Sequence, residues 1–238
     1  FTATAEYRRR VIQLGESPER VFNFGAPGLD AIQKSSLFTQ EAFEREIDFS
    51  LGKLNFLVTY HPVTLGYQSP QQSVQALLNA LDAFPDAQII FTGQNSDTEG
   101  RIIGQLLHEY VESHSTRSRI YSSLGQLKYL SAIQHVDVVI GNSSSGLSEV
   151  TAMKKPTVNI GDRQKGRLRA DSVIDCKENT EEIVQAIHRA LSPEIQQRLT
   201  TVTCPYGAGN VSPRIKEVLK TWNLKNIFRK PFYDLPKI

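Results

Sequence analysis

Hydrophobic residues recur along this chain with two alternating spacings, one typical of strands and the other of helices. Short apolar runs such as FLVTY and VDVVI are typical of strands that are buried on both faces. Between such runs lie amphipathic segments, and one of them places Val74, Leu77, Leu78 and Leu81 on a single helix face. Because a strand and a helix alternate about five times, the pattern predicts βαβ units. The expected fold class is therefore α/β, a doubly wound parallel sheet of the Rossmann-like kind with helices on both faces.

The same pattern gives the expected bounds of the elements. Strands are expected at residues 21–25, 56–60, 89–92, 119–121, 136–140, 157–160 and 172–174. Helices are expected at residues 5–14, 39–49, 70–84, 97–112, 126–134, 180–191, 193–200 and 213–222, with a further helix beginning near Ser145. In such a sheet, ligands bind where the carboxyl ends of strands lead into loops, so candidate chemistry is expected there.

Composition excludes several classes of protein. The 238 residues are 39% hydrophobic and 22% charged, and 27 Lys and Arg against 25 Asp and Glu give a net charge of +2. This balance argues against a nucleic-acid partner, and no apolar run of about 18 residues predicts a membrane span. Cys176 and Cys204 stand far apart and are interpreted as buried, reduced thiols, so the expected compartment is the cytoplasm. No cluster of metal-ligating residues occurs in the sequence, and neither a metal nor a cofactor is expected.

The segment VVIGNSSSGLSEV, residues 138–150, joins a buried strand to a helix through small residues. Such a loop brings together backbone N–H groups, a helix dipole and the hydroxyls of Ser143 and Ser144, which can hold a phosphate. The alternative is a serine that caps a helix in a tight turn and needs no ligand. The segment lacks the GxGxxG and GxxxxGK(S/T) spacings, and Asn142 replaces the first glycine of a GxSxG elbow. Glu149, further along, is either a solvated charge or a carboxylate that accepts hydrogen bonds from ribose hydroxyls.

Three further candidates follow other strands. His61 comes directly after FLVTY and can donate to a phosphate or transfer a proton near neutral pH. Asn95 lies in the loop FTGQNSDTEGR, where an Asx-type helix cap is the simpler interpretation. Arg163 begins a run of four cations within seven residues, which is either a solvated loop or a match for a phosphate-rich ligand. The other four histidines fall in expected helices or at helix ends and are interpreted as surface or packing residues.

Taken in order, these motifs resemble the UDP-N-acetylglucosamine 2-epimerase family along essentially the whole chain. The matching segments are YHPVT, GQNSDTEGR, IGNSSSGLSEV, PTVNIGDRQKGR and GAGNVSPRI, and DTEGR and RQKGR are closer to the hydrolysing, sialic-acid-pathway branch. The resemblance implies two Rossmann-like domains that face each other across a cleft, the GT-B architecture. Because the chain opens inside an expected helix without Met or a signal peptide, we expect it to be the carboxy-terminal half of a longer protein. Residues 1–20 would be the tail of the first domain, residues 21–212 the UDP-binding domain, and residues 213–238 the helix and tail that return to the first domain.

The resemblance also assigns roles to residues. His61 matches the active-site histidine near the diphosphate. Polar ligands of UDP are expected at the positions that match the diphosphate loop, the ribose carboxylate and the cleft, which are Ser143, Ser144, Glu149, Asn95 and Arg163. The uracil is expected to meet the backbone of the region that contains Tyr121, Ser122, Ser123 and Leu124.

The activity implied by the resemblance is anti elimination of UDP from UDP-N-acetylglucosamine, followed by hydration of 2-acetamidoglucal to N-acetylmannosamine. This half would stabilise the departing UDP, and the base is expected from the absent domain, so the piece alone is expected to bind and not to catalyse. Expected partners are UDP-N-acetylglucosamine, UDP and the missing amino-terminal domain, and a homo-oligomer is left open. The alternatives are a non-hydrolysing epimerase that interconverts UDP-N-acetylglucosamine and UDP-N-acetylmannosamine, a GT-B glycosyltransferase, and a non-catalytic module that binds sugar nucleotides.

Overall fold

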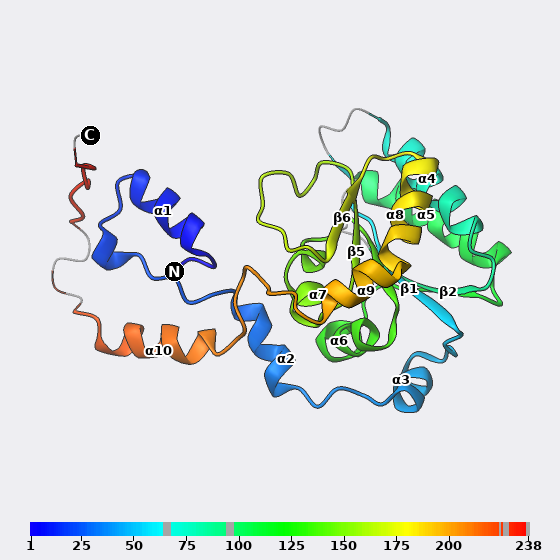
Figure 1. Ribbon diagram of the computed structural model, residues 1–238, viewed down its shortest axis with the longest axis horizontal. Helices are drawn as coiled ribbons and strands as arrows, with labels where there is room; N and C mark the ends of the chain where they lie inside the picture. The colour runs from blue at the N-terminus through cyan, green and yellow to red at the C-terminus, as the bar shows by residue number, and fades with distance from the viewer. Residues whose placement is uncertain (64–67, 94–97, 224, 226–228, 237–238) are drawn as a thin grey trace. The chain divides into compact units, whose positions relative to one another are not determined.

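Most of the elements expected from the hydrophobic pattern form, and they belong to two units of the chain (Figure 1). The computed structural model describes residues 1–63, 68–93, 98–223, 225 and 229–236. One unit comprises residues 36–203 and carries the sheet, and the other combines residues 1–35 with residues 204–238. All of the candidate site residues belong to the sheet unit.

The sheet is parallel throughout its described strands. These strands are β1 (Leu54–Thr59), β2 (Ala87–Thr92), β3 (Ser118–Tyr121), β4 (Val138–Gly141), β5 (Thr157–Ile160) and β6 (Val173–Cys176). They lie in the order β3-β2-β1-β4-β5-β6, so β4 returns to the free side of β1 and its Gly141 pairs with Thr59 at the last rung. This is the strand order of a doubly wound fold, so the predicted fold class is confirmed. The β1–β4 boundary is the place where such sheets bind their ligands.

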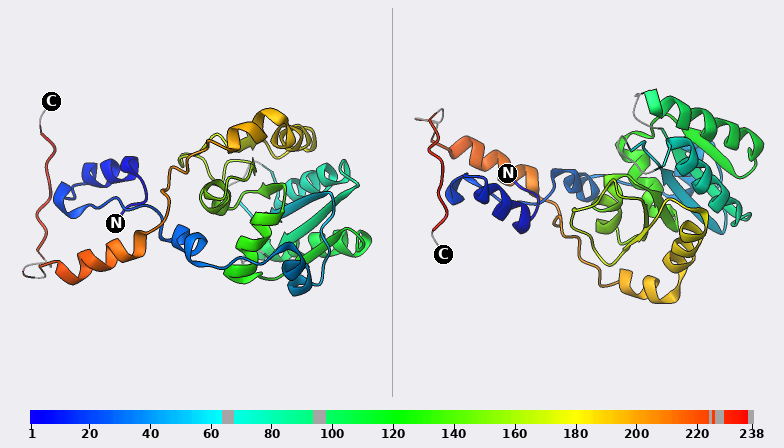
Figure 2. Two further views of the ribbon diagram at one scale, coloured as in Figure 1. Left: turned by 60° about the horizontal axis from the view of Figure 1, so that its bottom comes forward. Right: turned by 90° about the horizontal axis from the view of Figure 1, so that it is seen from above.

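Helices cover both faces of this sheet (Figure 2). The described helical elements of the unit are α3 (Gln40–Ile47), α4 (Pro70–Asp82), α5 (Thr98–Ser113), α6 (Gly125–His135), the 3-10 turn η3 (Ser144–Gly146), α7 (Glu149–Ala152), α8 (Thr180–Leu191) and α9 (Pro193–Leu199). α4, α5 and α8 share one core with Phe56 and Val58 of β1. Leu57 points to the opposite face, where α6 and α3 pack together, and it is fully buried as well. Burial on both faces explains why β1 is an uninterrupted apolar run.

Local sequence signals set the helix starts in this unit. Ser69 and Gln72 form a reciprocal capping box around Pro70, the first residue of α4. Asn179 caps α8, since its Oδ1 accepts a hydrogen bond from the backbone N of Glu182 at 2.9 Å. Among the described helices, none has the length and apolar character needed to cross a bilayer.

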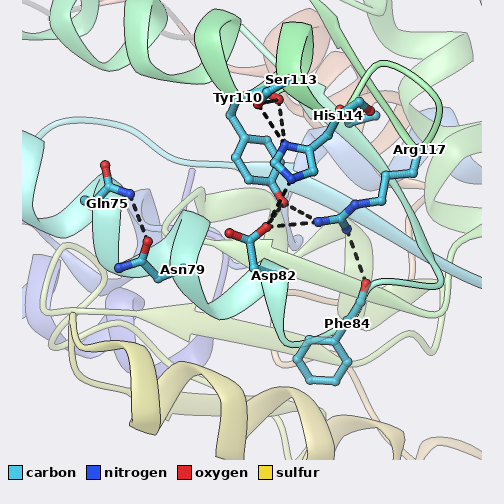
Figure 3. Close-up of polar contacts among 9 residues, drawn as sticks. Gln75, Asn79, Asp82, Phe84, Tyr110, Ser113, His114 and Arg117 are labelled. Carbon is cyan, nitrogen blue, oxygen red and sulfur yellow. Dashed lines mark hydrogen bonds and ion pairs between the residues drawn. The ribbon is translucent and has the colours of Figure 1, made fainter.

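A polar cluster ties α4 and α5 to the start of β3 (Figure 3). Asp82 accepts hydrogen bonds from Tyr110 Oη at 2.8 Å and from Arg117 Nη2 at 3.0 Å. Arg117 also donates to the carbonyl of Phe84 at 3.2 Å, and the His114 ring stacks on Tyr110 with centroids 4.2 Å apart. Burial, and then the hydrogen bond to Asp82, raise the pKa of Tyr110, so its phenol remains a donor. The cluster lies toward the amino end of β3, away from the candidate site, and its role is to hold the helices to the sheet.

The second unit is built around the meeting of two chain segments. Its described elements are α1 (Ala5–Gln13), η1 (Pro18–Arg20), η2 (Pro27–Leu29), α2 (Asp30–Lys34) and α10 (Val211–Thr221). Asn210, which precedes α10, has a left-handed conformation and makes no side-chain cap. Asp30 supplies the cap from the other segment, because its carboxylate accepts hydrogen bonds from the backbone N of Val211 at 2.8 Å and of Ser212 at 2.7 Å.

The predicted strand at residues 21–25 and the predicted burial of the cysteines are wrong. Residues 21–25 form no strand, and within the described structure Asn23 makes only an isolated bridge with Thr2. The apolar side chains of this segment enter an aromatic cluster instead, with neighbouring ring centroids 5.5 to 5.8 Å apart, formed by Phe1, Phe22, Phe24 and Trp222. Neither Cys176 nor Cys204 forms a disulfide with a described residue, which agrees with the prediction of reduced thiols, but both are half-buried rather than buried.

Candidate functional site

The carboxyl ends of β1 and β4 meet closely because Gly141 lets the chain turn there. Gly141 has a φ of +136°, and a Cβ at this position would lie 1.9 Å from the carbonyl oxygen of Thr59. Only glycine permits this backbone conformation at so short a distance. The structure therefore starts the His61 segment and the serine loop from adjacent positions at the centre of the sheet.

Asn142 joins the two strand ends through its side chain. Its Oδ1 accepts a hydrogen bond from the backbone N of His61 at 2.8 Å, and its Nδ2 donates to the His61 carbonyl at 2.8 Å. Its backbone N donates to the Thr59 carbonyl at 3.2 Å. Its own carbonyl accepts from Arg163 Nη1 at 3.0 Å and from Gln164 Nε2 at 2.7 Å. Because Asn142 is 0% exposed, these bonds serve groups that have no access to water, and they hold the loops after β1, β4 and β5 together.

The serine loop forms one turn of 3-10 helix rather than the helix expected near Ser145. Ser143 caps this turn, since its Oγ accepts a hydrogen bond from the backbone N of Ser145 at 3.4 Å. Tyr129 of α6 shares a hydrogen bond with the Ser145 hydroxyl, and α7 begins only at Glu149. Serine hydroxyls bond to nearby backbone groups and thereby favour turns over a continued helix. The local structure is thus the serine cap, and a strong helix dipole is not available here.

Groups that can bind an anion are nevertheless present in this loop. Within the described chain, the backbone N–H groups of Ser143 and Ser144 have no hydrogen-bond acceptor. Arg163 is exposed as a whole residue, but its guanidinium is partly buried where Nη1 donates to the neighbouring Asn142 carbonyl at 3.0 Å. Burial, and then the charge of Arg167, lower the pKa of Arg163, but a guanidinium remains protonated at neutral pH. Successive free N–H groups next to a cation are an arrangement that binds phosphate.

The other cations of this run are engaged differently. Lys165 Nζ lies 3.0 Å from Asp162, and Arg169 Nη1 lies 3.3 Å from Asp175. Arg163 is therefore the cation that the structure ties to the serine loop. For Lys165, which is exposed, the interpretation as part of a solvated loop fits.

A pocket of about 380 Å³ opens at the carboxyl ends of β2 and β3. Its lining includes Ser122, Ser123, Leu124 and Tyr129. Tyr121 does not line it, because its hydroxyl donates to a carbonyl at the end of α3 at 2.6 Å, and burial raises its pKa to about 12. At Tyr121 only the backbone can face a ligand in this pocket.

Two candidates have less structural support. Glu149 is half-buried, and its carboxylate accepts a hydrogen bond from the Ser148 hydroxyl. Its match to a ribose ligand stays a prediction. Asn95 lies outside the described residues.

A larger pocket, of about 660 Å³, lies away from these groups. It opens beside α3 at the amino ends of β2 and β3, and its lining includes Glu41, Arg45 and Asp48. Ligands of doubly wound sheets bind at the carboxyl ends of strands, so we do not place the site here despite the greater volume.

The remaining histidines are surface or packing residues, as expected. His108 is exposed, and His135 Nε2 lies 2.8 Å from the Phe38 carbonyl. The ring of His188 packs 4.9 Å from that of Phe84.

Comparison with known proteins decides the family. A family model described as UDP-N-acetylglucosamine 2-epimerase matches residues 1–220. The chain belongs to this epimerase family. The GDP/UDP-N,N'-diacetylbacillosamine 2-epimerase (hydrolyzing) of Campylobacter jejuni is 39% identical over 236 residues, which cover 99% of this chain and 61% of that protein. The polysialic acid biosynthesis protein P7 of Escherichia coli is 38% identical over 240 residues, with 100% and 60% covered. The chain thus spans about three fifths of the length of these relatives.

Solved structures of epimerases have the same fold. The UDP-GlcNAc 2-epimerase of Methanocaldococcus jannaschii, in complex with UDP-GlcNAc and UDP, superposes with a TM-score of 0.71 at 19% identity, covering 92% of this chain and 60% of that one. The enzyme of Neisseria meningitidis bound to UDP-GlcNAc gives a TM-score of 0.66 at 14% identity, with 92% and 60% covered. At these identities the likeness establishes the fold.

Three residues that hold this candidate site together have no function predicted from the sequence. Asn142 enters the sequence analysis only as a departure from the GxSxG elbow, and no motif singles out Gln164 or Tyr129. Gln164 is 1% exposed, and its Oε1 has no hydrogen-bond partner among the residues that the structure describes. The signal available for Asn142 was its place directly after a buried strand, because a polar residue there must find partners inside the protein.

Proposed function

We propose that this chain is the UDP-binding half of a hydrolysing UDP-N-acetylglucosamine 2-epimerase with two Rossmann-like domains of the GT-B type. The observation that carries the proposal is the set of anion-binding groups at the β1–β4 boundary. His61, Arg163 and the N–H groups of Ser143 and Ser144, which have no acceptor among the described residues, are gathered around Asn142. Membership in the epimerase family supports the same function.

Each part of UDP has a place in this proposal. The diphosphate binds the N–H groups and hydroxyls of Ser143 and Ser144, with Arg163 opposing its charge. The ribose hydroxyls donate to Glu149. The uracil enters the pocket at the ends of β2 and β3, which is lined by Ser122, Ser123 and Leu124. The backbone of Tyr121, directly before them in the chain, is proposed to complete this contact.

The reaction begins with elimination. A base removes the proton at C2 of the sugar, the electron pair forms the C1–C2 double bond, and the C1–O bond breaks as UDP leaves with its electrons. His61 and Arg163 act on the departing diphosphate, because preorganised donors and cations stabilise charge as it develops. Water then adds to the 2-acetamidoglucal, placing a hydroxyl on C1 and a proton on C2 to give N-acetylmannosamine. The base comes from carboxylates of the other domain.

The other domain also accounts for apolar surface on the second unit. Leu14 is 78% exposed, Leu219 is 64% exposed and Phe232 is 69% exposed. Apolar surface of this kind is typical of an interface. We place the domain boundaries after residue 20 and after residue 212, with residues 213–238 returning to the first domain.

A second candidate is the same reaction on a different sugar. The relatives from Campylobacter jejuni and Legionella pneumophila, 39% and 34% identical, are both named as UDP-N,N'-diacetylbacillosamine 2-epimerases. That naming favours a test of the diacetamido sugar nucleotide beside UDP-N-acetylglucosamine.

The test is product analysis of the complete protein in D2O. With UDP-N-acetylglucosamine we expect UDP and N-acetylmannosamine that carries deuterium at C2, and the 238-residue chain alone should bind UDP without forming either product. UDP-N-acetylmannosamine as the product would establish the non-hydrolysing reaction instead. Transfer of the sugar to an acceptor with its C2 hydrogen retained would establish a glycosyltransferase. Turnover only with UDP-N,N'-diacetylbacillosamine would select the second candidate.

A further inference from the structure

The side chain of Asn142 continues the β1–β4 ladder after the backbone has left it. The parallel pairing of the two strands ends at Thr59 and Gly141, where the positive φ of Gly141 turns the chain out of the sheet. One position further, the carboxamide of Asn142 meets both backbone groups of His61, accepting from N and donating to O at 2.8 Å each. A side-chain amide carries N–H donors beside a carbonyl acceptor, the same two kinds of group that a peptide unit offers, so it can replace the missing rung.

The hydrogen bonds between the Asn142 side chain and the His61 backbone fix the position from which the His61 side chain extends. The backbone N and O of His61 are both held, so its Cα, from which the ring extends, has a set position relative to Asn142. Ser143 follows Asn142 directly in the chain and carries one of the free N–H groups. The carbonyl of Asn142 also anchors Arg163 and Gln164. One buried residue therefore sets the spacing between the histidine, the serine loop and the cation.

We propose that Asn142 is the positioning residue of this site, which holds His61 in register with the diphosphate groups and acts on the reaction through His61. The proposal rests on the proposed function and extends it by one residue. Asparagine is required at this position because one short side chain must present both a donor, for the His61 carbonyl, and an acceptor, for the His61 N–H. Aspartate would still accept from the His61 N–H, but it would set a second oxygen against the His61 carbonyl.

The chain provides a matched control at the amino end of β1, the strand that leads to His61. Asn55 of β1 is 6% exposed, and its side chain also bonds to backbone, accepting from Gly52 N at 2.8 Å and donating to Gly52 O at 3.0 Å. It further ties β1 to the chain before β4 through Asp137, whose Oδ2 lies 3.4 Å from Asn55 Nδ2. Asn55 thus has similar burial and bonding at the amino end of the sheet, away from the site.

The experiment is a double-mutant cycle in the complete protein, with UDP release from UDP-N-acetylglucosamine as the rate. Asn142→Ala should lower kcat on the order of 10²-fold, the effect of a misplaced catalytic group. On a His61→Ala background, Asn142→Ala should lower kcat by less than about twofold further, because residues that act as one unit are not additive. Asn55→Ala should leave kcat within about twofold of the wild type while it lowers the melting temperature. If Asn142→Ala does not fold, Asn142→Asp serves in its place, since it retains one of the two bonds to His61.

Two results would overturn the positioning role. One is equal loss of kcat in Asn55→Ala and Asn142→Ala, which would indicate general destabilisation. The other is a loss of kcat in the double variant that equals the product of the losses in Asn142→Ala and His61→Ala.

Hydrogen exchange of the His61 amide separates this inference from the proposed function. That amide donates to Asn142 Oδ1, so it should exchange on the order of tenfold faster in Asn142→Ala. If the wild type releases no UDP but this acceleration occurs, the proposed function fails and the positioning role stands. If UDP is released and the exchange rate is unchanged, the positioning role fails.

Discussion

Replacing Asp30 with asparagine removes a charge from the point where two distant chain segments meet. The side chain of Asp30 is 5% exposed, and its two oxygens accept from the backbone N of Val211 and of Ser212 at the start of α10. Asn210 provides no cap, so Asp30 is the group that opposes the positive end of this helix. Asp30→Asn has nearly the same shape but keeps only one acceptor oxygen and no charge.

The magnitude follows from the pKa of Asp30. The hydrogen bond from the Ser212 side chain, and next that from the Val211 backbone, lower this pKa from its ordinary value of 3.8 to about 2. A shift of this size corresponds to about 2 kcal/mol of unfolding free energy, and we expect a loss of about 1 to 2 kcal/mol because asparagine keeps one of the two acceptor oxygens. Because the folded-state pKa is the lower one, this stability is present above the unfolded pKa and is lost as the pH falls through about 2.

Trp222 makes the effect measurable in this unit alone. It is the only tryptophan of the sequence, it belongs to the same unit as Asp30, and its ring packs edge-on against Phe22 at 5.6 Å. Urea unfolding followed by Trp222 fluorescence at pH 7 should show Asp30→Asn less stable by about 1 to 2 kcal/mol, and the gap should close toward pH 2. Asp234→Asn, at an exposed carboxylate of the same unit, is the control and should change stability by less than about 0.5 kcal/mol. Equal stabilities at pH 7, or a gap that persists at pH 2, would refute this account of Asp30.

Three further predictions concern UDP binding, the tight turn at Gly141 with Gly104 as its control, and the polar cluster around Arg117. Glu149→Ala should weaken UDP binding by about 1 to 3 kcal/mol in calorimetry, because ribose hydroxyls lose their acceptor, and an unchanged affinity would make Glu149 a solvated charge. Gly141→Ala should destabilise the sheet unit by more than about 2 kcal/mol in circular-dichroism melts, since its Cβ would meet the Thr59 carbonyl at 1.9 Å. Gly104→Ala, with no atom within 4 Å of its Cβ inside α5, should instead stabilise by about 0.5 to 1 kcal/mol, and similar effects of the two changes would contradict the steric argument. Arg117→Ala should lower the unfolding free energy by about 1 to 3 kcal/mol in urea titrations, because it removes the donor shared by Asp82, Tyr110 and the Phe84 carbonyl, and a change within error would show the cluster to be incidental.

The sheet and its covering helices could be predicted from the sequence because their signals are local. β5 spans Thr157–Ile160 and α8 spans Thr180–Leu191, the bounds that the hydrophobic pattern predicts. In a regular helix or strand, whether a side chain is buried depends on its place in the repeat. The spacing of apolar residues in the sequence therefore predicts the element and its buried face.

The predicted strand at residues 21–25 and the predicted helix near Ser145 fail because other contacts outweigh the hydrophobic period. VFNFG has the alternation of a strand, but its rings find Phe1 and Trp222, which lie far away at the two ends of the chain. GNSSSG has the small residues of a helix start, but serine hydroxyls bond to the backbone and stop the helix after one 3-10 turn. Neither competition can be decided from the segment itself.

In the candidate site, residues with distinctive side-chain chemistry could be predicted from the sequence, whereas a residue that matters through strand register could not. His61 and Arg163 could be singled out because imidazole and guanidinium groups have recognisable chemistry wherever they stand. Asn142 has ordinary chemistry, and its importance comes from pairing β1 with β4 so that Thr59 lies opposite Gly141. That register cannot be read from either strand alone. It does follow from the doubly wound order, in which the strand that returns beside β1 always brings the loops after the two strands together. Polar residues within about two positions of the carboxyl ends of those strands are therefore the set to test first for positioning roles in a chain of this fold, including residues whose side chains take no part in chemistry.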